Sequence, residues 1–169
     1  MTARPQQYRL PLRSPLAWLA SLGVGMLPGA PGTYGSALVA AAAGVWLAAG
    51  GAPLKGGWYL GVVAGVTTLA VAASQAALQR RLFGPGADPG QITIDEAAGQ
   101  LLALFGLGGA GWWWHLAAAF TLFRFLDITK PLGIRASQGL PGGWGVVIDD
   151  LLAGFYTAVA LRLAHQLWS

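Results

Sequence analysis

The stretch from Trp58 to Leu78 contains no charged residue. A helix needs about 20 predominantly apolar residues to cross a bilayer, and this run is long enough. Only 9% of the whole chain is charged and 55% is hydrophobic, whereas charged residues make up about 25% of an average soluble domain. We therefore predict an all-α, multi-helical integral membrane protein with short and partly spanning helices. It forms a single domain over residues 1–169, with a basic N-terminal tail at 1–13.

Further apolar segments lie on both sides of this run, separated by glycine and proline clusters. Only the run at 58–78 and the last segment reach the length of a full crossing. The glycine-rich stretch 106–111 is too flexible to continue a helix, so we expect the segments around it to form a hairpin. The apolar segments cover residues 36–50, 58–78, 97–107, 112–125 and 145–168.

If each apolar segment leads to the opposite side of the membrane and the segments around 106–111 form a hairpin, the charged residues divide unequally between the two sides. All six acidic residues and all but two of the ten basic residues fall on one side, with Lys55 and Arg162 on the other. By the positive-inside tendency, the charged side faces the cytoplasm. The net charge of +4 is spread along the chain, without the basic block that a nucleic-acid partner requires. The absence of cysteine excludes thiolate chemistry.

Prolines and glycines concentrate in "LPGAPGTYGS", which ends at Ser36. In one interpretation, this is a tight entry into the first helix, with Ser36 as its N-cap. In the other, successive backbone N–H groups, including those of Gly32 and Gly35, surround an anion together with the hydroxyl groups of Thr33 and Ser36. The spacing does not match a Walker loop, and both interpretations stay open.

Two adjacent acids, Asp95 and Glu96, stand where a helix is expected to begin in "DPGQITIDEAAGQ". A favourable interaction with the helix dipole would explain one of them. Adjacent side chains diverge by about 100° on a helix, so a cap does not explain both, and we favour a functional role. Asp88 lies in a loop rich in glycine and proline and is expected to serve a turn.

In "FTLFRFLDITKPLGI", Arg124, Asp127 and Lys130 are spaced three apart, on one helical face, and Pro131 marks the expected stop. A plain ion pair would account for Arg124 and Asp127. The second cation makes an anion site beside a metal ligand the favoured interpretation.

The last polar cluster is Asp149 and Asp150 in "GGWGVVIDDLLAGF". A carboxylate buried without a partner would cost several kcal/mol, which a divalent cation offsets. Carboxylates with nearby cations suit Mg²⁺ holding a phosphate better than zinc. His115 and His165 lie apart from these clusters and are expected to be packing or interfacial residues.

Four of these motifs, "GAPGTYGS", "ITIDEAAG", "LFRFLDITKPLGI" and "GGWGVVIDDLLAGF", resemble in order and spacing those of bacterial phosphatidylglycerophosphatase A, over about residues 14–160. The resemblance implies an all-helical, Mg²⁺-dependent hydrolase of the inner membrane. Such an enzyme removes the terminal phosphate of phosphatidylglycerophosphate to give phosphatidylglycerol and inorganic phosphate.

These observations lead to a hypothesis for the site. Asp127 orients or deprotonates the attacking water, and Arg124 and Lys130 bind the phosphate oxygens. The loop with Gly32, Thr33, Gly35 and Ser36 adds backbone and hydroxyl donors. A transporter or a scaffold protein remains the alternative, although neither requires acids and bases on one face. The Mg²⁺ ligands are expected among Asp95, Glu96, Asp149 and Asp150.

Overall fold

The computed structural model of the protein describes residues 13–84 and 90–168. Asp88 with its expected turn, and nearly all of the basic tail, lie outside these residues. Within them the chain forms seven α-helices and one short 3-10 helix, and its only β pairing is a single bridge between Leu54 and Leu107, which confirms the all-α prediction. The helices are α1 (Pro15–Ser21), η1 (Val24–Met26), α2 (Pro31–Ala48), α3 (Gly56–Gln79), α4 (Ile94–Ala103), α5 (Trp112–Thr129), α6 (Ile134–Ser137) and α7 (Gly143–Trp168).

The first long helix begins earlier than the apolar pattern predicts. α2 starts at Pro31, because proline has a fixed φ suited to the first helical position, where its missing N–H is not needed. Its N-cap is Ala30, so the interpretation of Ser36 as the cap is wrong. Ser36 lies inside the helix, where its hydroxyl donates a hydrogen bond of 2.9 Å to the carbonyl oxygen of Gly32.

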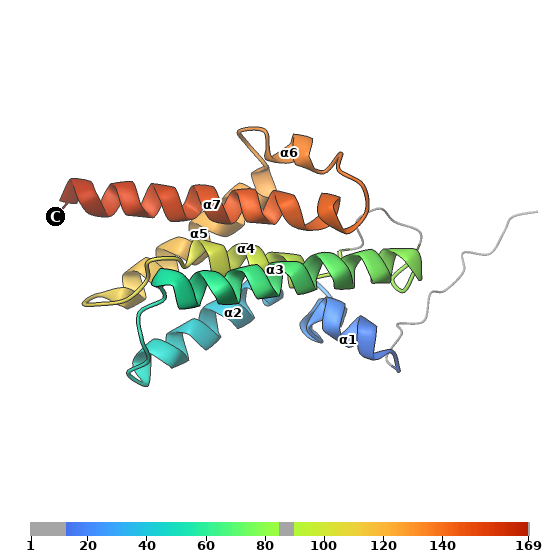
Figure 1. Ribbon diagram of the computed structural model, residues 1–169, viewed down its shortest axis with the longest axis horizontal. Coiled ribbons are helices and arrows are strands. Elements are labelled where there is room, and N and C mark those ends of the chain that lie inside the picture. Colours follow the sequence, from blue (N-terminus) through green and yellow to red (C-terminus); the bar gives the residue numbers. More distant parts are fainter. Residues whose placement is uncertain (1–12, 85–89, 169) are drawn as a thin grey trace, which may run out of the picture.

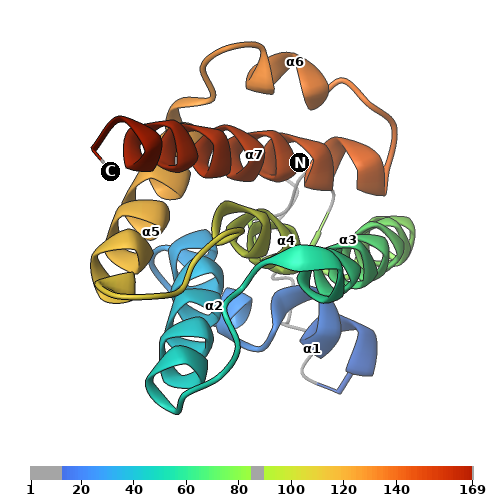
Figure 2. The same cartoon turned by 60° about the vertical axis from the view of Figure 1, so that its left-hand side comes forward.

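The short helix α4 lies in the middle of the bundle, packed against α2, α3, α5 and α7 (Figures 1 and 2). The loop after it pairs with the segment before α3, since Leu54 N–H donates to the Leu107 carbonyl over 2.7 Å. α5 then returns antiparallel to α4, bringing Asp127 close enough to Glu96 for their charges to interact. The predicted hairpin is therefore confirmed, and the acids of both segments lie at one end of the bundle.

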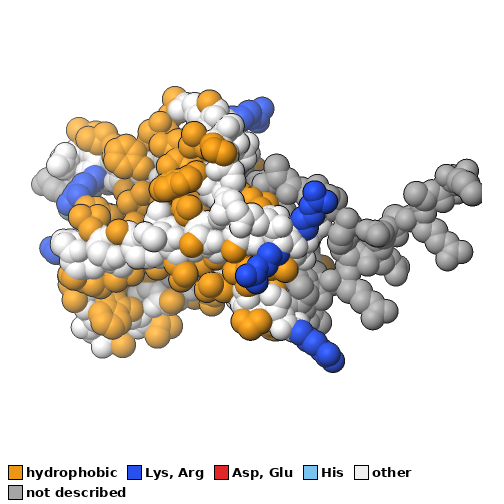
Figure 3. Space-filling view, turned by 45° about the vertical axis from the view of Figure 1, so that its right-hand side comes forward, with side chains coloured by type: hydrophobic (Ala, Val, Ile, Leu, Met, Phe, Trp, Pro, Cys, Tyr) orange, Lys and Arg blue, Asp and Glu red, His pale blue; other side chains and the backbone are white. Residues whose placement is uncertain are grey.

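One helix of the described chain, α3, is long and apolar enough to cross a membrane. Only 28% of its most apolar stretch is buried in the protein, and Trp58, Leu60 and Val62 on it are exposed. Figure 3 shows apolar side chains over much of one face of the molecule, with no acidic side chain in view. Such a surface is what a bilayer covers, so membrane association is plausible.

The structure supports this single span, whereas the sequence led us to expect several. α4 has ten residues, so it is only about 15 Å long, half the thickness of a hydrocarbon core. Most of its side chains are buried by the neighbouring helices. Its apolar character therefore serves the protein core, which hydropathy along the chain does not distinguish from contact with lipid.

Candidate active site

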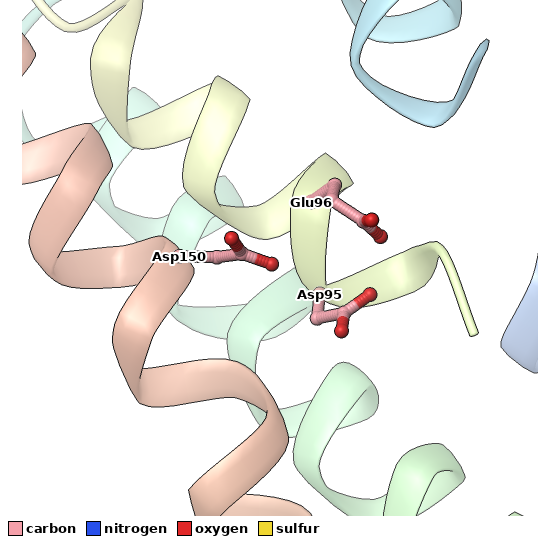
Figure 4. A group of neighbouring side chains, drawn as sticks. All are labelled: Asp95, Glu96 and Asp150. Carbon is pink, nitrogen blue, oxygen red and sulfur yellow. The ribbon is translucent and has the colours of Figure 1, made fainter. Parts of the chain in front are cut away.

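Three carboxylates from two helices meet beside the first turn of α4. Asp95 and Glu96 lie in that turn, and Asp150 lies near the start of α7. One oxygen from each lies within 4.8 Å of the others, and Figure 4 shows the three side chains directed toward a common space. Asp95 and Asp150 are buried and Glu96 is half-buried. Like charges this close, away from water, require a cation or a proton between them.

A pair of glycines lets α4 and α7 approach closely enough to form this cluster. A Cβ on Gly99 would lie 2.5 Å from the carbonyl oxygen of Asp150 and 2.7 Å from the ring of Phe123. A Cβ on Gly154 would overlap the carbonyl oxygen of Gly99. Since these neighbours are mostly backbone atoms, larger residues would force the two helices apart. The glycines thus set the distance between Asp150 and the acids of α4.

Asp149 has a different set of partners from Asp150, although both are buried. Its Oδ2 accepts hydrogen bonds from Lys130 Nζ and, over 3.0 Å, from Gln138 Nε2. Adjacent residues on a helix diverge by about 100°, so α7 directs one carboxylate toward α4 and the other toward the segment after α5. Only Asp150 joins Asp95 and Glu96 in the group that fits one metal ion.

Arg124 and Asp127 form an ion pair on α5, with 2.5 Å between Nη1 and Oδ2. The same Nη1 donates to the Ser36 hydroxyl over 3.5 Å. Lys130 Nζ lies 3.7 Å from the other oxygen of Asp127. Lys130 is the C-cap of α5, in the left-handed region at φ 47°, and not a helical residue as its spacing suggested. From there it still faces Asp127 and Asp149.

The first turn of α2 lies against Glu96 and Arg124. A Cβ on Gly32 would overlap the Glu96 carboxylate and would lie 3.2 Å from Arg124 Nη1. Gly32 and the half-buried Thr33 occupy the first helical turn, where backbone N–H groups have no partner in the helix. Gly35 faces elsewhere, since a Cβ there would lie 2.9 Å from that of Thr93.

The acid cluster shows its crowding in the pKa values of its members. Burial raises the pKa of Asp150 well above its usual value, and the charges of Asp127, Asp95 and Glu96 raise it further. Burial also raises the pKa of Glu96, as does Asp127, while Asp95 and Arg124 oppose the rise. A cation placed among these groups would favour their charged forms.

For Lys130, burial alone would lower the pKa. The hydrogen bond to Asp149, together with the charges of Asp149, Asp150 and Asp127, outweighs this and raises the pKa above its usual value. The ammonium group is therefore held in its charged form at neutral pH, beside the acid cluster.

The donor set fits a hard divalent cation. Among the described residues, the buried oxygens Glu96 Oε2, Asp149 Oδ1 and Asp150 Oδ1 accept no hydrogen bond. Buried carboxylate oxygens without a donor are costly unless a metal or a ligand satisfies them. Carboxylates are the side chains that Mg²⁺ prefers, and no histidine or cysteine stands near to favour zinc. Arg124 Nε is likewise buried without an acceptor, as suits a donor that binds an incoming anion.

Two histidines stand apart from this site, as the sequence indicated. His115 lies near the start of α5 and His165 near the end of α7, with their rings 5.6 Å apart and edge to face. Both positions are at the end of the bundle away from the carboxylates.

The sequence analysis did not single out three glutamines that the structure places in polar contacts or in the core. Gln138 follows α6 and holds Asp149, and Gln75 on α3 accepts the Gly143 N–H over 2.7 Å at the start of α7. Gln100 is fully buried on α4, and neither polar atom of its amide has a partner among the described residues. No spacing rule marks the first two, because their partners are distant in the sequence. A glutamine in the apolar stretch after Asp95 and Glu96 was the available signal for Gln100.

An all-α bundle with buried acids, cations and a helix N-terminus at one end defines a class of helical protein suited to phosphate-bearing ligands. A family model described as "Phosphatidylglycerophosphatase A" matches residues 17–165. The chain belongs to this phosphatidylglycerophosphatase A family, a family of phosphomonoesterases.

Individual relatives agree with this membership. A Haemophilus influenzae protein named phosphatidylglycerophosphatase A is 36% identical over 173 residues, which cover 99% of both chains. The Escherichia coli protein of the same name is 39% identical over 82 residues, 48% of this chain and 47% of that protein. A Bacteroides thetaiotaomicron protein, provisionally named a phosphatidylinositol-3-phosphatase, is 41% identical over 81 residues, 47% of this chain and 51% of that protein. No solved structure matches the chain.

Proposed function

We propose that the protein is a Mg²⁺-dependent lipid phosphatase that hydrolyses the terminal phosphate monoester of phosphatidylglycerophosphate, releasing phosphatidylglycerol and inorganic phosphate. The observation that carries the proposal is the cluster of Asp95, Glu96 and Asp150, whose oxygens lie within 4.8 Å of one another, beside the cations Arg124 and Lys130. The relative that matches over its full length bears the name of this activity.

Asp95, Glu96 and Asp150 hold the metal in this proposal. When bound there, Mg²⁺ supplies positive charge to the phosphoryl oxygens and makes a coordinated water more acidic. Asp149, which the sequence placed among the same candidate ligands, contributes by holding Lys130. Gln138 restrains Asp149 from the other side.

The cations beside the carboxylates would hold the substrate phosphate. Arg124 and Lys130 donate to its oxygens and stabilise the charge that develops in the transition state. Ser36 holds the guanidinium of Arg124, and the first-turn N–H groups of Gly32 and Thr33 add donors. Gly35 contributes indirectly, since its lack of a side chain lets α2 pack against Thr93.

Asp127 orients the attacking water or takes its proton. The water oxygen forms a bond to phosphorus as the bond from phosphorus to the glycerol oxygen breaks. The released alcohol oxygen takes a proton from solvent, and the phosphate leaves as the free anion. Arg124 and Lys130 flank Asp127, and these two contacts fix the position of its carboxylate.

The site works at a membrane surface. The exposed apolar helix α3 supports membrane association, and the excess of basic residues around the acid cluster supports a cytoplasmic location for this end. We propose that the protein lies in the bacterial inner membrane, with its site at the level of the lipid headgroups.

Purified full-length protein in neutral detergent, given phosphatidylglycerophosphate with a radiolabelled terminal phosphate, tests the proposal. We expect release of inorganic phosphate that EDTA abolishes and added Mg²⁺ restores. Full activity after rigorous chelation would exclude the metal mechanism. No release under any condition would favour a transporter or a scaffold, and movement of a solute across proteoliposomes would separate these two.

A further inference from the structure

A polar cavity lies at the end of the bundle away from the acid cluster. It has a volume of about 480 Å³, and the loop between α4 and α5 forms one wall. α5 contributes His115, α7 contributes Arg162 and His165, and the segment before α3 contributes Lys55. Every ionisable side chain that lines it can carry positive charge.

No described carboxylate lines this cavity beside Lys55 and Arg162. The described acids all belong to the site at the opposite end, and none of them lines this cavity. Lys55 and Arg162 therefore present positive charge without a counter-ion from the described residues. An anion is the complementary ligand.

Specific side-chain contacts shape the wall of this cavity. The guanidinium of Arg162 lies over the ring of Phe105, 5.3 Å from its centroid, which positions the charge at the wall. His115 and His165 meet edge to face at 5.6 Å. Gly106 and Gly109, at φ 98° and 85°, have open space where a side chain would be. This turn requires glycine, and the missing side chains leave the cavity accessible.

Lipid surrounds this end of the molecule if α3 spans the bilayer. Lys55 is the N-cap of α3, whereas Gln75, near the other end of α3, contacts the start of α7 close to the acid cluster. A helix of 24 residues is about 36 Å long, so its ends reach opposite membrane surfaces. The helices that line the cavity also expose Trp113, Trp114, Leu163 and Leu167, in keeping with a membrane interface.

We propose that this cavity binds the phosphate group of an anionic phospholipid from the leaflet opposite the active site. Lys55 and Arg162 pair with the phosphate, and the exposed apolar residues of α5 and α7 contact the acyl chains. Free phosphate shares the charge but lacks the chains, so it should bind weakly. The inference uses α3 as a span and does not depend on the phosphatase reaction.

Native mass spectrometry of the full chain, released from neutral detergent, can test the site with dioleoylphosphatidylserine, which is neither the proposed substrate nor its product. We expect the doubly substituted variant Lys55→Gln/Arg162→Gln to bind this lipid about 30-fold more weakly, because each cation at an anionic surface contributes about fivefold. The matched control Arg13→Gln/Arg80→Gln removes two exposed charges elsewhere and should bind the lipid about as tightly as the wild type. Arg162→Lys should retain most of the binding.

Thermal unfolding of the same preparations in detergent reports whether each variant is folded, and this readout does not require phosphatase activity. Equal lipid binding by the Lys55/Arg162 variant and its control would overturn the proposal. Binding of inorganic phosphate as tight as that of the lipid would overturn the lipid assignment, and equal binding of dioleoylphosphatidylcholine would overturn the requirement for an anion.

Discussion

Gly154 on α7 lies directly against the carbonyl oxygen of Gly99 on α4, with no room for a Cβ between them. Gly154→Ala should therefore destabilise the protein by about 1–3 kcal/mol, the usual cost of overpacking. Thermal unfolding in detergent measures this. Gly65→Ala on the exposed side of α3 is the matched control: its Cβ would meet nothing, and alanine favours the helix by about 0.5–1 kcal/mol. Equal melting temperatures for the two variants would refute the close contact.

Removal of one charge from the acid cluster should separate activity from stability. Asp150→Asn should lower turnover by about 100-fold or more, since even residues that only support a metal ligand cost up to that much. It should also raise the melting temperature of the metal-free protein, because it removes one of several crowded like charges. Asp95→Asn and Glu96→Gln should behave similarly in turnover and in Mg²⁺ binding by calorimetry. The turnover of the Asp88→Asn variant should stay near that of the wild type. Loss of activity in that variant alone would place the metal elsewhere.

Lys130 and Asp149 should act as a unit. We expect Lys130→Gln and Asp149→Asn each to reduce turnover by about 10- to 100-fold, the range for residues that orient a site. The doubly substituted protein should be no worse than the poorer single variant, because each change already breaks the same pair. Phosphate release from the four proteins of this cycle gives the coupling. Fully multiplicative losses would mean that Asp149 works independently of Lys130, for example as a metal ligand.

The orientation of the chain can be read by cysteine labelling, since it has no cysteine of its own. Ser137→Cys, at the acid end, should react with a membrane-impermeant thiol reagent only after the cytoplasmic side is opened. Lys55→Cys, at the other end, should react from outside in intact cells. The reverse pattern would invert the proposed topology and leave the proposed chemistry intact.

Substrate choice should depend on the lipid. Soluble glycerol phosphate lacks acyl chains and should react poorly, because binding energy from distant parts of a substrate supports catalysis. Phosphatidic acid keeps the monoester and the chains but lacks the phosphodiester and the second glycerol. It should be a poorer substrate than phosphatidylglycerophosphate. Arg135, exposed on α6, is our candidate for contact with the diester, so Arg135→Ala should narrow the gap in kcat/KM. Equal rates on both lipids in the unmodified protein would remove the basis for this selectivity.

Much of the fold followed from local patterns. Apolar runs without charges predict helices and a lipid environment. A helix satisfies its own backbone hydrogen bonds, so apolar side chains allow it to lie in lipid. The glycines at 106–111 marked the turn of the hairpin. The spacing of Arg124 and Asp127 allowed the ion pair that they form, although we favoured an anion site beside a metal ligand. These features depend on residues near one another in the chain.

Tertiary structure decided how the carboxylates divide and how many helices face lipid. The helical geometry of α7 requires Asp149 and Asp150 to diverge, but it does not say that one meets Lys130 and the other Asp95 and Glu96. That depends on Gly99 and Gly154, which set the approach of two helices distant in the sequence. Burial of α4 within the bundle likewise depends on its neighbours. Helix formation is local, whereas the partner of a buried charge and the exposure of an apolar face depend on long-range packing.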